Sequence, residues 1–546
     1  MAKRGIAAVE KTVPLETTLW NCRVALRGVG SIEKNRDAII ALVFIKFASE
    51  KFEKRRAEII AEYGDNPIFV EKRSFYSSKN VFYINEKSRW RYIKDNSSAN
   101  DIAIIIDKAM KDIEDSNPSL AGTLPLNGFV NLGADKSKIK ALIDEVNNID
   151  ESKYQEVDLI GRVYEYFIQA YAASGTKEDG EFYTPSSVVK LIAEMIEPYS
   201  GTVYDPCCGS GGMFVQSMKF VDRHNGNRSR ISVLGQESIK ETWRLCKLNL
   251  AIRGIAHNLG PENKSTFEKD LHEGRKVDFI MANPPFNLKG WRSENTKAEE
   301  PRFQGYSVLP PASNGNYAWI LHMLNKLDVS HGIAGFLLAN GALNADDDEA
   351  ILREEILRKD VLEAIIVLPR DMFYTTDISV TLWILNMNKK AGVINGRQVR
   401  DRRHQVLFMD LRTWDANLEE IKIEKGSKKK VVFSDEQIAK IKQIYNNWQS
   451  VDLSLYSDIP EFCKSVKLFK TDRTPQEEKD DVPTIEGKDW SLAPSKYIEF
   501  IDHDLDIDYN AEMLRIQREM KSVLIKELDS QKKLTDAFKG IGYDIK

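Results

Sequence analysis

The sequence predicts an α/β protein in which a mostly parallel, seven-stranded sheet follows an all-helical N-terminal region and precedes a C-terminal helix. Three observations predict this class. Apolar residues have helical spacing over about the first 150 residues, short apolar runs alternate with amphipathic segments after Gly180, and helical spacing returns beyond Asp508. With 546 residues the chain is long enough for two or three domains. We expect them to span residues 1–154, 155–469 and 470–546.

The N-terminal domain is predicted to be mostly helical. Apolar side chains crowd the stretch from Ala38 to Phe52, and charged residues follow in its tail, a pattern typical of a helix. A second strong helical pattern runs from Asp150 to Tyr171 and ends in the small residues Ala172–Gly175.

In the central domain, apolar strands alternate with helices, which indicates a parallel sheet covered on both faces. The predicted strands lie near Val203–Tyr204, Ile231–Leu234, Ser265–Phe267, Val277–Met281, Gly332–Leu338, Leu362–Leu368 and Val380–Leu385, with Gln405–Met409 as a candidate for one more. The predicted helices are Ser186–Glu197, Gly212–Val221, Lys240–Ile252, Tyr317–Leu327 and Glu349–Leu357.

The C-terminal region is predicted to contain a linker and a helix. Lys470–Asp481 is polar and contains Pro475, which is typical of a linker or a mobile loop. Met513–Phe538 carries apolar residues at intervals of three and four with charges between them, which predicts an amphipathic helix.

Composition limits the class of protein. The formal net charge of −4 excludes a strongly basic nucleic-acid wrapper, so a field that attracts DNA must be local or come from a partner. The five cysteines include no CxxC pair, and the adjacent Cys207 and Cys208 make a poor chelate, so we expect reduced thiols and no metal. The first 16 residues lack the apolar core of a signal peptide, and no apolar run approaches the ~20 residues of a membrane span. We therefore expect a cytoplasmic protein.

The strongest chemical signal is the tetrapeptide Asn283-Pro284-Pro285-Phe286, which follows the apolar run Val277–Met281. Open α/β sheets bind ligands beyond the carboxyl ends of their strands. Because the prolines fix the backbone, the Asn283 side-chain oxygen and the Pro284 carbonyl can form two neighbouring acceptors, which suit a planar exocyclic amine. Phe286 offers a stacking face for a base turned out of a helix. The alternative is a simple strand-ending turn.

A glycine-rich turn follows the first predicted strand. Asp205 ends that strand, and Gly209, Gly211 and Gly212 come after it. Glycines let the backbone approach a ligand closely, and an acid at this place suits a ligand ammonium group. The spacing is neither GxGxxG nor GxxxxGK[ST], which disfavours NAD and nucleoside triphosphates. The alternative is a purely structural turn.

Two more acids follow predicted strands. Glu237 comes after the second strand, where an acid can accept both hydroxyls of a ribose, and Asp270 comes after Ser265–Phe267. On its own, each is more often a solvated surface residue. Upstream, the segment FYTP predicts a helix start with Thr184 as N-cap and Pro185 in the first turn.

In the order FYTP, DPCCGSGG, GQE and NPPF, these motifs closely resemble those of gamma-type DNA adenine amino-methyltransferases. The resemblance implies a Rossmann-like sheet, S-adenosylmethionine as cofactor and methyl transfer to N6 of adenine. It implies that NPPF holds the target amine, that Glu237 binds the ribose and that Asp270 contacts the adenine ring of the cofactor. The implied catalytic residues are Asn283, Pro284, Pro285 and Phe286. The implied cofactor residues are Glu181, Phe182, Tyr183, Thr184, Pro185, Asp205, Gly209, Ser210, Gly211, Gly212, Met213, Glu237 and Asp270.

The flanking segments narrow the resemblance. Leu19–Asn21, Leu26–Gly28, Phe44–Phe47 and Leu159–Phe167 are similar to modification subunits of type I restriction–modification systems, and Leu492–Tyr497 is weakly so. This implies a subunit that methylates double-stranded DNA and protects host DNA. It also implies that one specificity subunit gathers two modification subunits through their C-terminal helices, and that a restriction subunit completes the complex.

Alternative functions are weighed against this one. The tetrapeptide also suits a base in RNA or a glutamine amide in a protein, and an assembly scaffold would retain the fold without activity. The complete set of Asp205, Glu237, Asn283 and Phe286 argues against a scaffold. The chain has no Walker A loop, and sequence choice is expected to lie in another chain. The long loop Asn287–Ser313 is expected to close on the flipped base.

Overall fold

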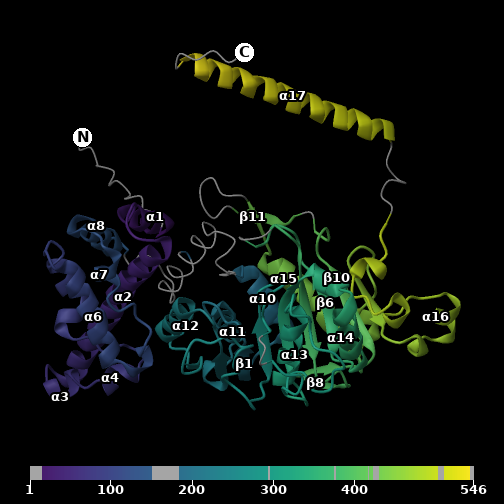
Figure 1. Ribbon diagram of the computed structural model, residues 1–546, viewed down its shortest axis with the longest axis horizontal. Helices are drawn as coiled ribbons and strands as arrows, with labels where there is room; N and C mark the ends of the chain where they lie inside the picture. The colour runs from purple at the N-terminus through teal and green to yellow at the C-terminus, as the bar shows by residue number, and fades with distance from the viewer. Residues whose placement is uncertain are drawn as a thin grey trace, which may run out of the picture. The chain divides into compact units, whose positions relative to one another are not determined.

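The computed structural model describes residues 15–149, 166, 184–292, 296–373, 377–415, 417–421, 429–501 and 509–540 (Figure 1). The chain divides into two compact units, Met1–Tyr497 and Ile498–Lys546. The first contains a group of N-terminal helices and a large sheet, and the second contains the helix α17 (Tyr509–Gly540). No helix of these residues is both long and apolar enough to cross a membrane.

Helices and turns make up the described N-terminal region, residues 15–149, which confirms the predicted helical domain. Their apolar faces share one core, and Ala38–Ser49 of α2 are buried throughout. The second predicted helix, Asp150–Tyr171, lies outside the described residues apart from Tyr166. The helices are α1 (Leu15–Ala25), α2 (Ile32–Tyr63), α3 (Pro67–Val70), α4 (Ser74–Ser77), α5 (Trp90–Asp95), α6 (Ile102–Ser116), α7 (Gly128–Leu132) and α8 (Lys136–Asn147).

The central domain is built on one sheet with the strand order β13-β10-β6-β7-β5-β4-β1-β2-β3. Neighbouring strands are parallel except where β7 or β13 takes part, so the predicted mostly parallel sheet is confirmed. Six of the seven predicted strands are found, as β1, β2, β4, β5, β6 and β7, and β10 is the predicted candidate for one more. β3 and β13 complete the nine strands of the described sheet. The strands are β1 (Gly201–Asp205), β2 (Ile231–Gly235), β3 (His257–Asn258), β4 (Phe279–Ala282), β5 (Ile333–Ala339), β6 (Leu362–Val367), β7 (Val380–Asn386), β10 (Gln405–Asp410) and β13 (Cys463–Lys467). Two small hairpins are β8 (Gly392–Ile394) with β9 (Arg397–Val399), and β11 (Glu419–Ile421) with β12 (Lys430–Val432).

The third strand does not lie where the sequence predicted it. Ser265–Phe267 contains a turn, and the strand is the two-residue β3 upstream. The Thr266 hydroxyl donates to the carbonyl of Pro206 at 2.5 Å, and Arg302 donates to the carbonyl of Thr266 at 2.9 Å. Tertiary hydrogen bonds therefore override the strand preference of these side chains.

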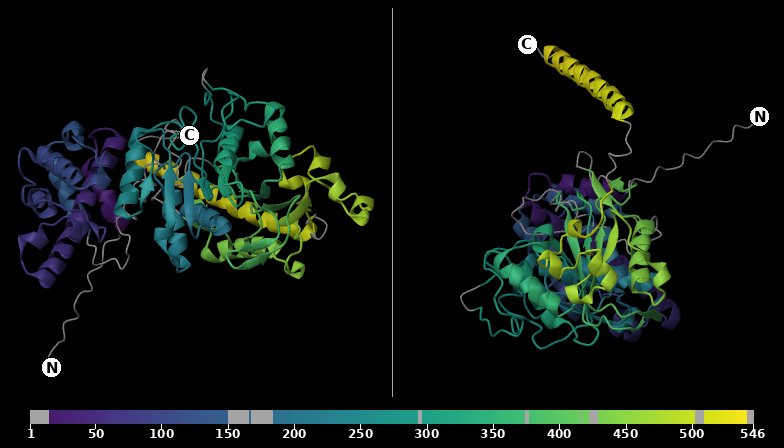
Figure 2. Two further views of the ribbon diagram at one scale, coloured as in Figure 1. Left: turned by 90° about the horizontal axis from the view of Figure 1, so that it is seen from below. Right: turned by 90° about the vertical axis from the view of Figure 1, so that its right-hand side faces the viewer.

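Helices cover both faces of the sheet (Figure 2). On one face α11 and α15 both pack against α10, and α13 and α14 lie on the other. The five predicted helices of this domain agree with the observed ones to within two residues at each end. Leu245 and Leu248 of α12 extend the core of the N-terminal helices. The helices are α10 (Ser186–Ile196), α11 (Gly212–Arg223), α12 (Lys240–Ile252), α13 (Asn316–Lys326), α14 (Asp347–Arg358) and α15 (Asp435–Gln449).

The predicted linker Lys470–Asp481 is not a linker. It contains a 3-10 turn and the short helix α16 (Pro475–Lys479), and the chain up to Tyr497 belongs to the first unit. Thr474 and Glu477 cap α16 reciprocally: the Thr474 hydroxyl accepts the Glu477 N–H at 3.3 Å, and the Glu477 carboxylate accepts the Thr474 N–H at 2.6 Å. The separate C-terminal unit therefore begins at Ile498 instead of residue 470.

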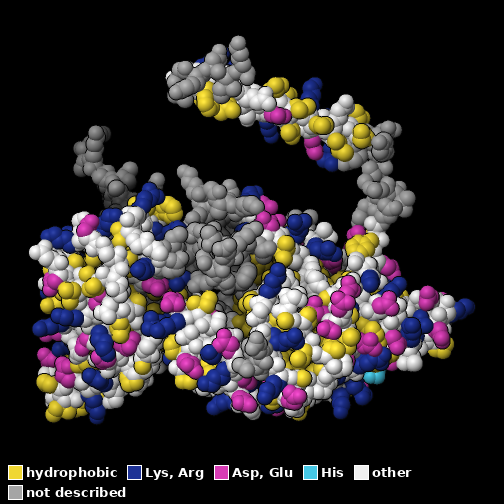
Figure 3. Space-filling model, viewed as in Figure 1, with side chains coloured by type: hydrophobic (Ala, Val, Ile, Leu, Met, Phe, Trp, Pro, Cys, Tyr) yellow, Lys and Arg dark blue, Asp and Glu magenta, His cyan; other side chains and the backbone are white. Residues whose placement is uncertain are grey.

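The predicted C-terminal helix is confirmed as α17. Its apolar side chains are exposed to solvent (Figure 3). Exposed fractions lie between 43% and 66% for Met513, Ile516, Met520, Val523, Leu524, Leu528 and Leu534.

Candidate active site

The two halves of the predicted site meet on neighbouring strands. β1 and β4 pair directly, Asp205 is the last residue of β1, and Asn283 follows the last residue of β4. The sheet continues from β1 to β2 and β3 on one side and to β4 and β5 on the other. Open α/β sheets bind ligands at such a switch point, beyond the carboxyl ends of the strands.

Carboxylates hold the turn that follows β1. Asp205 accepts the backbone N–H of Cys207 at 3.0 Å, and Glu237, two residues beyond β2, accepts that of Gly209 at 2.9 Å. Gly209 has a φ of 52°, in the region that favours glycine. A β-carbon added at Gly209 or Gly212 would meet no atom within 4 Å. A ligand can therefore approach this backbone.

Asp205 is a buried carboxylate that forms no ion pair with a described cationic side chain. It is 2% exposed, and burial raises its pKa to about 7, with a further increase from the charge of Glu237. Burial also raises the pKa of Glu237. Because a buried carboxylate without compensation is costly, a positively charged ligand at this turn would be stabilised.

Asn283 presents an acceptor that the described fold does not use. Its Nδ2 donates to the hydroxyl of Thr184 at 2.8 Å, while its Oδ1 is shielded from solvent and has no hydrogen-bond partner there. Buried polar groups are nearly always paired, so this oxygen indicates a ligand with a donor. The prediction that Thr184 caps α10 is wrong: the N-cap is Pro185, and the Thr184 side chain bonds to Asn283 instead.

Two residues that sequence reasoning missed hold the loop of Asp270. Lys326 of α13 is 2% exposed, forms an ion pair with Asp270 and donates to the carbonyl of His272 at 2.6 Å. Burial opposes the charge of Asp270, yet the hydrogen bond and charge of Lys326 help to hold its pKa below its ordinary value. Gln236 is fully buried. Its side-chain amide bonds to the backbone of Lys264, Lys269 and Leu271.

Comparison with known proteins gives the family. A family described as N-6 DNA Methylase matches residues 155–483, more than half of the chain, and one described as the HsdM N-terminal domain matches residues 15–146. The chain is also 33% identical over 453 residues to the methylase subunit of the type I restriction enzyme HindI of Haemophilus influenzae, covering 81% of this chain and 93% of that protein. The chain belongs to the N-6 DNA methylase family.

Further relatives support the assignment of this methylase. It is 27% identical over 550 residues to the MjaIX methylase subunit of Methanocaldococcus jannaschii, covering 98% of this chain and 92% of that protein. It shares its fold with the type I restriction–modification methyltransferase subunit of Streptococcus thermophilus, at a TM-score of 0.69 and 21% identity, over 89% of this chain and 99% of that one. The methylase is the modification subunit of a type I restriction–modification system and methylates N6 of adenine in DNA.

The structure places the predicted cofactor residues of the methylase as follows. Asp205, Glu237 and the turn Gly209–Gly212 surround one end of β1 and β2, and Met213 is buried in the first turn of α11. Asp270 lies on a loop whose backbone bonds to the side chain of Gln236, the residue that follows β2. Three predicted residues, Glu181, Phe182 and Tyr183, lie outside the described residues.

The turn after NPPF is pinned by a residue that sequence reasoning also missed. Phe286 is partly buried against the core of the catalytic domain. The backbone N–H of Asn287 donates to Asn316 Oδ1 at 2.9 Å, and Asn316 Nδ2 donates to Asn287 Oδ1 at 2.9 Å. Asn316, which begins α13, therefore fixes the backbone that follows the NPPF tetrapeptide.

The long loop Asn287–Ser313 has neither helix nor strand in its described residues. Trp291 is nevertheless buried and donates to the carbonyl of Pro311 at 2.8 Å. Arg302 donates to the carbonyl of Thr266. Trp291 and Arg302 therefore hold this loop against the rest of the fold.

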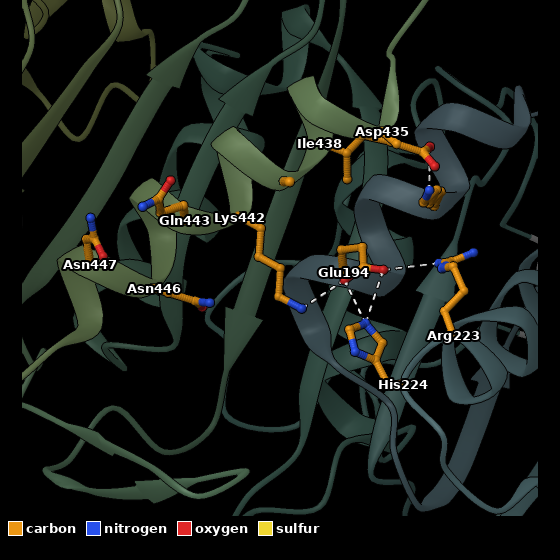
Figure 4. Close-up of a pocket in the computed structure, with 11 residues that line it drawn as sticks. Glu194, Arg223, His224, Asp435, Ile438, Lys442, Gln443, Asn446 and Asn447 are labelled. Carbon is orange, nitrogen blue, oxygen red and sulfur yellow. Dashed lines mark hydrogen bonds and ion pairs between the residues drawn. The ribbon is translucent and has the colours of Figure 1, made fainter.

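A hollow of about 480 Å³ between α10, α11 and α15 lies apart from this site (Figure 4). At its centre Glu194 accepts from Arg223 at 3.1 Å, His224 at 3.2 Å and Lys442 at 2.8 Å. α10 begins beside Asn283, and Glu194 lies near its other end, so the hollow is not part of the active site. Among the described residues, no group of His, Cys, Asp and Glu is placed to hold a metal ion.

Proposed function

We propose that this methylase holds the amine of a flipped adenine between Asn283 Oδ1 and the carbonyl of Pro284 while a methyl group is transferred to it. The unpartnered, shielded Oδ1 of Asn283 carries this proposal. Asn283 follows β4 directly, so a rigid strand of the sheet positions this oxygen.

The residues present fit S-adenosylmethionine. Asp205, which forms no ion pair with a described cation, suits the ammonium group of the cofactor. Glu237 suits its ribose hydroxyls, and Asp270 suits its adenine ring. The open space beside Gly209 and Gly212 allows the cofactor to contact the backbone of the turn. When bound, this cofactor supplies a methyl group on an electrophilic sulfonium. We propose that the turn Gly209–Gly212, with these carboxylates, holds it.

The side chains of the site then act through position and fixed dipoles. The lone pair of an adenine amine is shared with the ring, which makes the amine a weak nucleophile. Two acceptors, Asn283 Oδ1 and the Pro284 carbonyl, take both N–H bonds and favour a pyramidal nitrogen. Because both acceptors are fixed before the amine arrives, little reorganisation is needed. Phe286 is proposed to stack on the base.

The chemistry of the turn does not suit attack by a thiolate. Burial raises the pKa of Cys207 well above its ordinary value, and the charges of Asp205 and Glu237 raise it further. Cys207 is therefore a neutral thiol near pH 7. Methylation of the cytosine ring requires an activated thiolate, so this feature favours an amine as the acceptor.

We propose that one specificity subunit joins two copies of this methylase through α17, and that a restriction subunit completes the complex on double-stranded DNA. The exposed apolar stripe of α17 supports this, because such a helix is marginal in water unless its stripe is covered. The net charge of −4 supports it as well, because DNA affinity would then come partly from a partner. Since its substrate is cellular DNA, we place the complex in the cytoplasm.

The substitution Asn283→Ala tests the proposed role of the tetrapeptide. We expect loss of methyl transfer from labelled cofactor to DNA, with cofactor affinity by calorimetry within about twofold, since Asn283 is assigned to the amine alone. Phe286→Ala serves as a milder comparison, because it removes stacking worth about 1–3 kcal/mol. Near-normal turnover by Asn283→Ala, or transfer to RNA or protein in preference to DNA, would contradict the proposal.

A further inference from the structure

The side chain of Asn283 can occupy two orientations of nearly equal shape. Rotating its amide by 180° exchanges Oδ1 and Nδ2, which differ little in size but oppositely in hydrogen bonding. In the structure Nδ2 faces the hydroxyl of Thr184 at 2.8 Å, and Oδ1 is left without a partner among the described residues. Only this orientation gives a target amine an acceptor; the other would set N–H₂ against N–H₂.

Thr184 is well placed to hold the Asn283 side chain. It directly precedes α10, whose first turn begins with Val188 and Val189 donating to the carbonyl of Pro185 at 3.0 and 3.1 Å. α10 packs against β4 and β5 of the sheet. This packing holds Thr184 close to the end of β4, which Asn283 directly follows. The Thr184 hydroxyl does not cap α10, although a threonine at a helix start commonly does.

We propose that Thr184 is a positioning residue whose hydroxyl holds the Asn283 side chain in place for the target amine. This inference rests on the proposed function of Asn283. It assigns the Thr184 hydroxyl to the base-holding half of the site, whereas the family resemblance implied a cofactor contact. In the structure the hydroxyl accepts one N–H of the amide and leaves Oδ1 without a partner among the described residues. Because a hydroxyl can also donate, the contact fixes the place of the side chain, and the target amine favours the orientation that offers it Oδ1.

Matched variants of Thr184 test the assignment in the complete methylase complex with its specificity subunit. Thr184→Val keeps the shape and removes the acceptor, and Thr184→Ser keeps the hydroxyl. We expect Thr184→Val to lower kcat about tenfold or more at saturating DNA and cofactor, the factor that corresponds to one lost hydrogen bond. We expect the Kd for S-adenosylmethionine to stay within about twofold by calorimetry, and Thr184→Ser to restore most of kcat.

The outcomes separate this inference from the proposed function. If the wild-type complex transfers no methyl group to DNA, the proposed function fails. If it does, and Thr184→Val is equally active, the positioning role alone is wrong. A rise in the cofactor Kd that matches the loss in kcat would make Thr184 a cofactor contact instead. If Thr184→Ser does not recover activity, the loss is due to packing and the positioning role is wrong. The thermal unfolding midpoint of Thr184→Ala, compared with that of the wild type, shows whether substitution at this position causes a folding defect.

Discussion

Asp205 is a carboxylate whose ionisation depends on what the site holds. Its pKa is raised to about 7 by burial, above the ordinary value of 3.8, and no described cation compensates it. Between about pH 4 and 7 the unfolded chain releases this proton before the folded protein does. Asp205 therefore lowers stability as pH rises through that range. A bound ammonium group reverses the preference, because it favours the ionised form.

Cofactor affinity should accordingly depend on pH. We expect the Kd for S-adenosylmethionine to be weaker by on the order of tenfold at pH 5.5 than at pH 7.5, since Asp205 must lose its proton before it can pair with the ammonium group. Titration calorimetry at the two values measures this. Asp205→Asn should bind weakly at both pH values with a much smaller difference, while Glu237→Gln should retain a difference. An unchanged pH dependence in Asp205→Asn would place the titrating group elsewhere.

Residue types could be predicted from the sequence here, but their partners could not. Asp205, Glu237 and the NPPF tetrapeptide lie at or just beyond strand ends that apolar runs locate, whereas the strand predicted before Asp270 is a turn. The pairing of Thr184 with Asn283 joins residues 99 positions apart. Such a contact depends on which helix packs against which strand, and no local pattern contains that information. Lys326 illustrates the same limit, since its position in an apolar helix gave no sign that it pairs with Asp270.

At the level of elements, α13 links the two halves of the site. Asn316 at its first turn pins the backbone after NPPF, and Lys326 at its last turn pairs with Asp270 on the cofactor side. The helix therefore spans from the proposed base-holding turn to the proposed adenine-binding loop. We therefore expect a substitution at one end of α13 to change the affinity for both the target base and the cofactor.

The substitution Lys326→Met should separate the contribution of the Lys326–Asp270 pair to stability from its contribution to cofactor binding. The variant keeps a long side chain but leaves Asp270 without its buried partner. We expect a lower thermal midpoint and a cofactor Kd raised on the order of tenfold, because the removal of one member of a buried pair leaves the other uncompensated. In Lys326→Met/Asp270→Asn the midpoint should recover in part, since the orphaned charge is gone, while cofactor affinity should not. Full recovery of affinity in the double variant would remove Asp270 from the cofactor site.

Two local patterns misled the sequence analysis for different physical reasons. Ser265–Phe267 has residues that favour strands, but its turn is fixed by Pro206 and Arg302, which are distant in sequence. The α16 segment lacks apolar residues, yet Thr474-Pro475 with Glu477 is a helix-start signature that can be recognised without the structure. The first error came from tertiary context, and the second from giving polarity more weight than capping.

At the level of the whole molecule, the second unit is the surface that we propose for assembly. Deleting residues after Asp508 should leave cofactor binding and the thermal midpoint of the first unit unchanged, because Met1–Tyr497 is compact by itself. It should abolish co-purification with the specificity subunit. Leu524→Asp on the apolar stripe should weaken that complex, whereas Ser522→Asp on the opposite face should not. Normal complex formation by the deletion variant would refute the role of α17.

Neither edge of the sheet is suited to pairing with a strand of another molecule, so the proposal for association rests on α17. β3 has only two residues, both polar. On the outer side of β13, Cys463 exchanges backbone hydrogen bonds with Ile459, the N–H of Ser465 donates to Asp458, and the carbonyl of Lys467 accepts from Ile485. A strand from another molecule would find one edge too short and the other already occupied. Crowded copies of the protein are thereby protected from edge-to-edge aggregation, even though each has a long helix with an exposed apolar stripe.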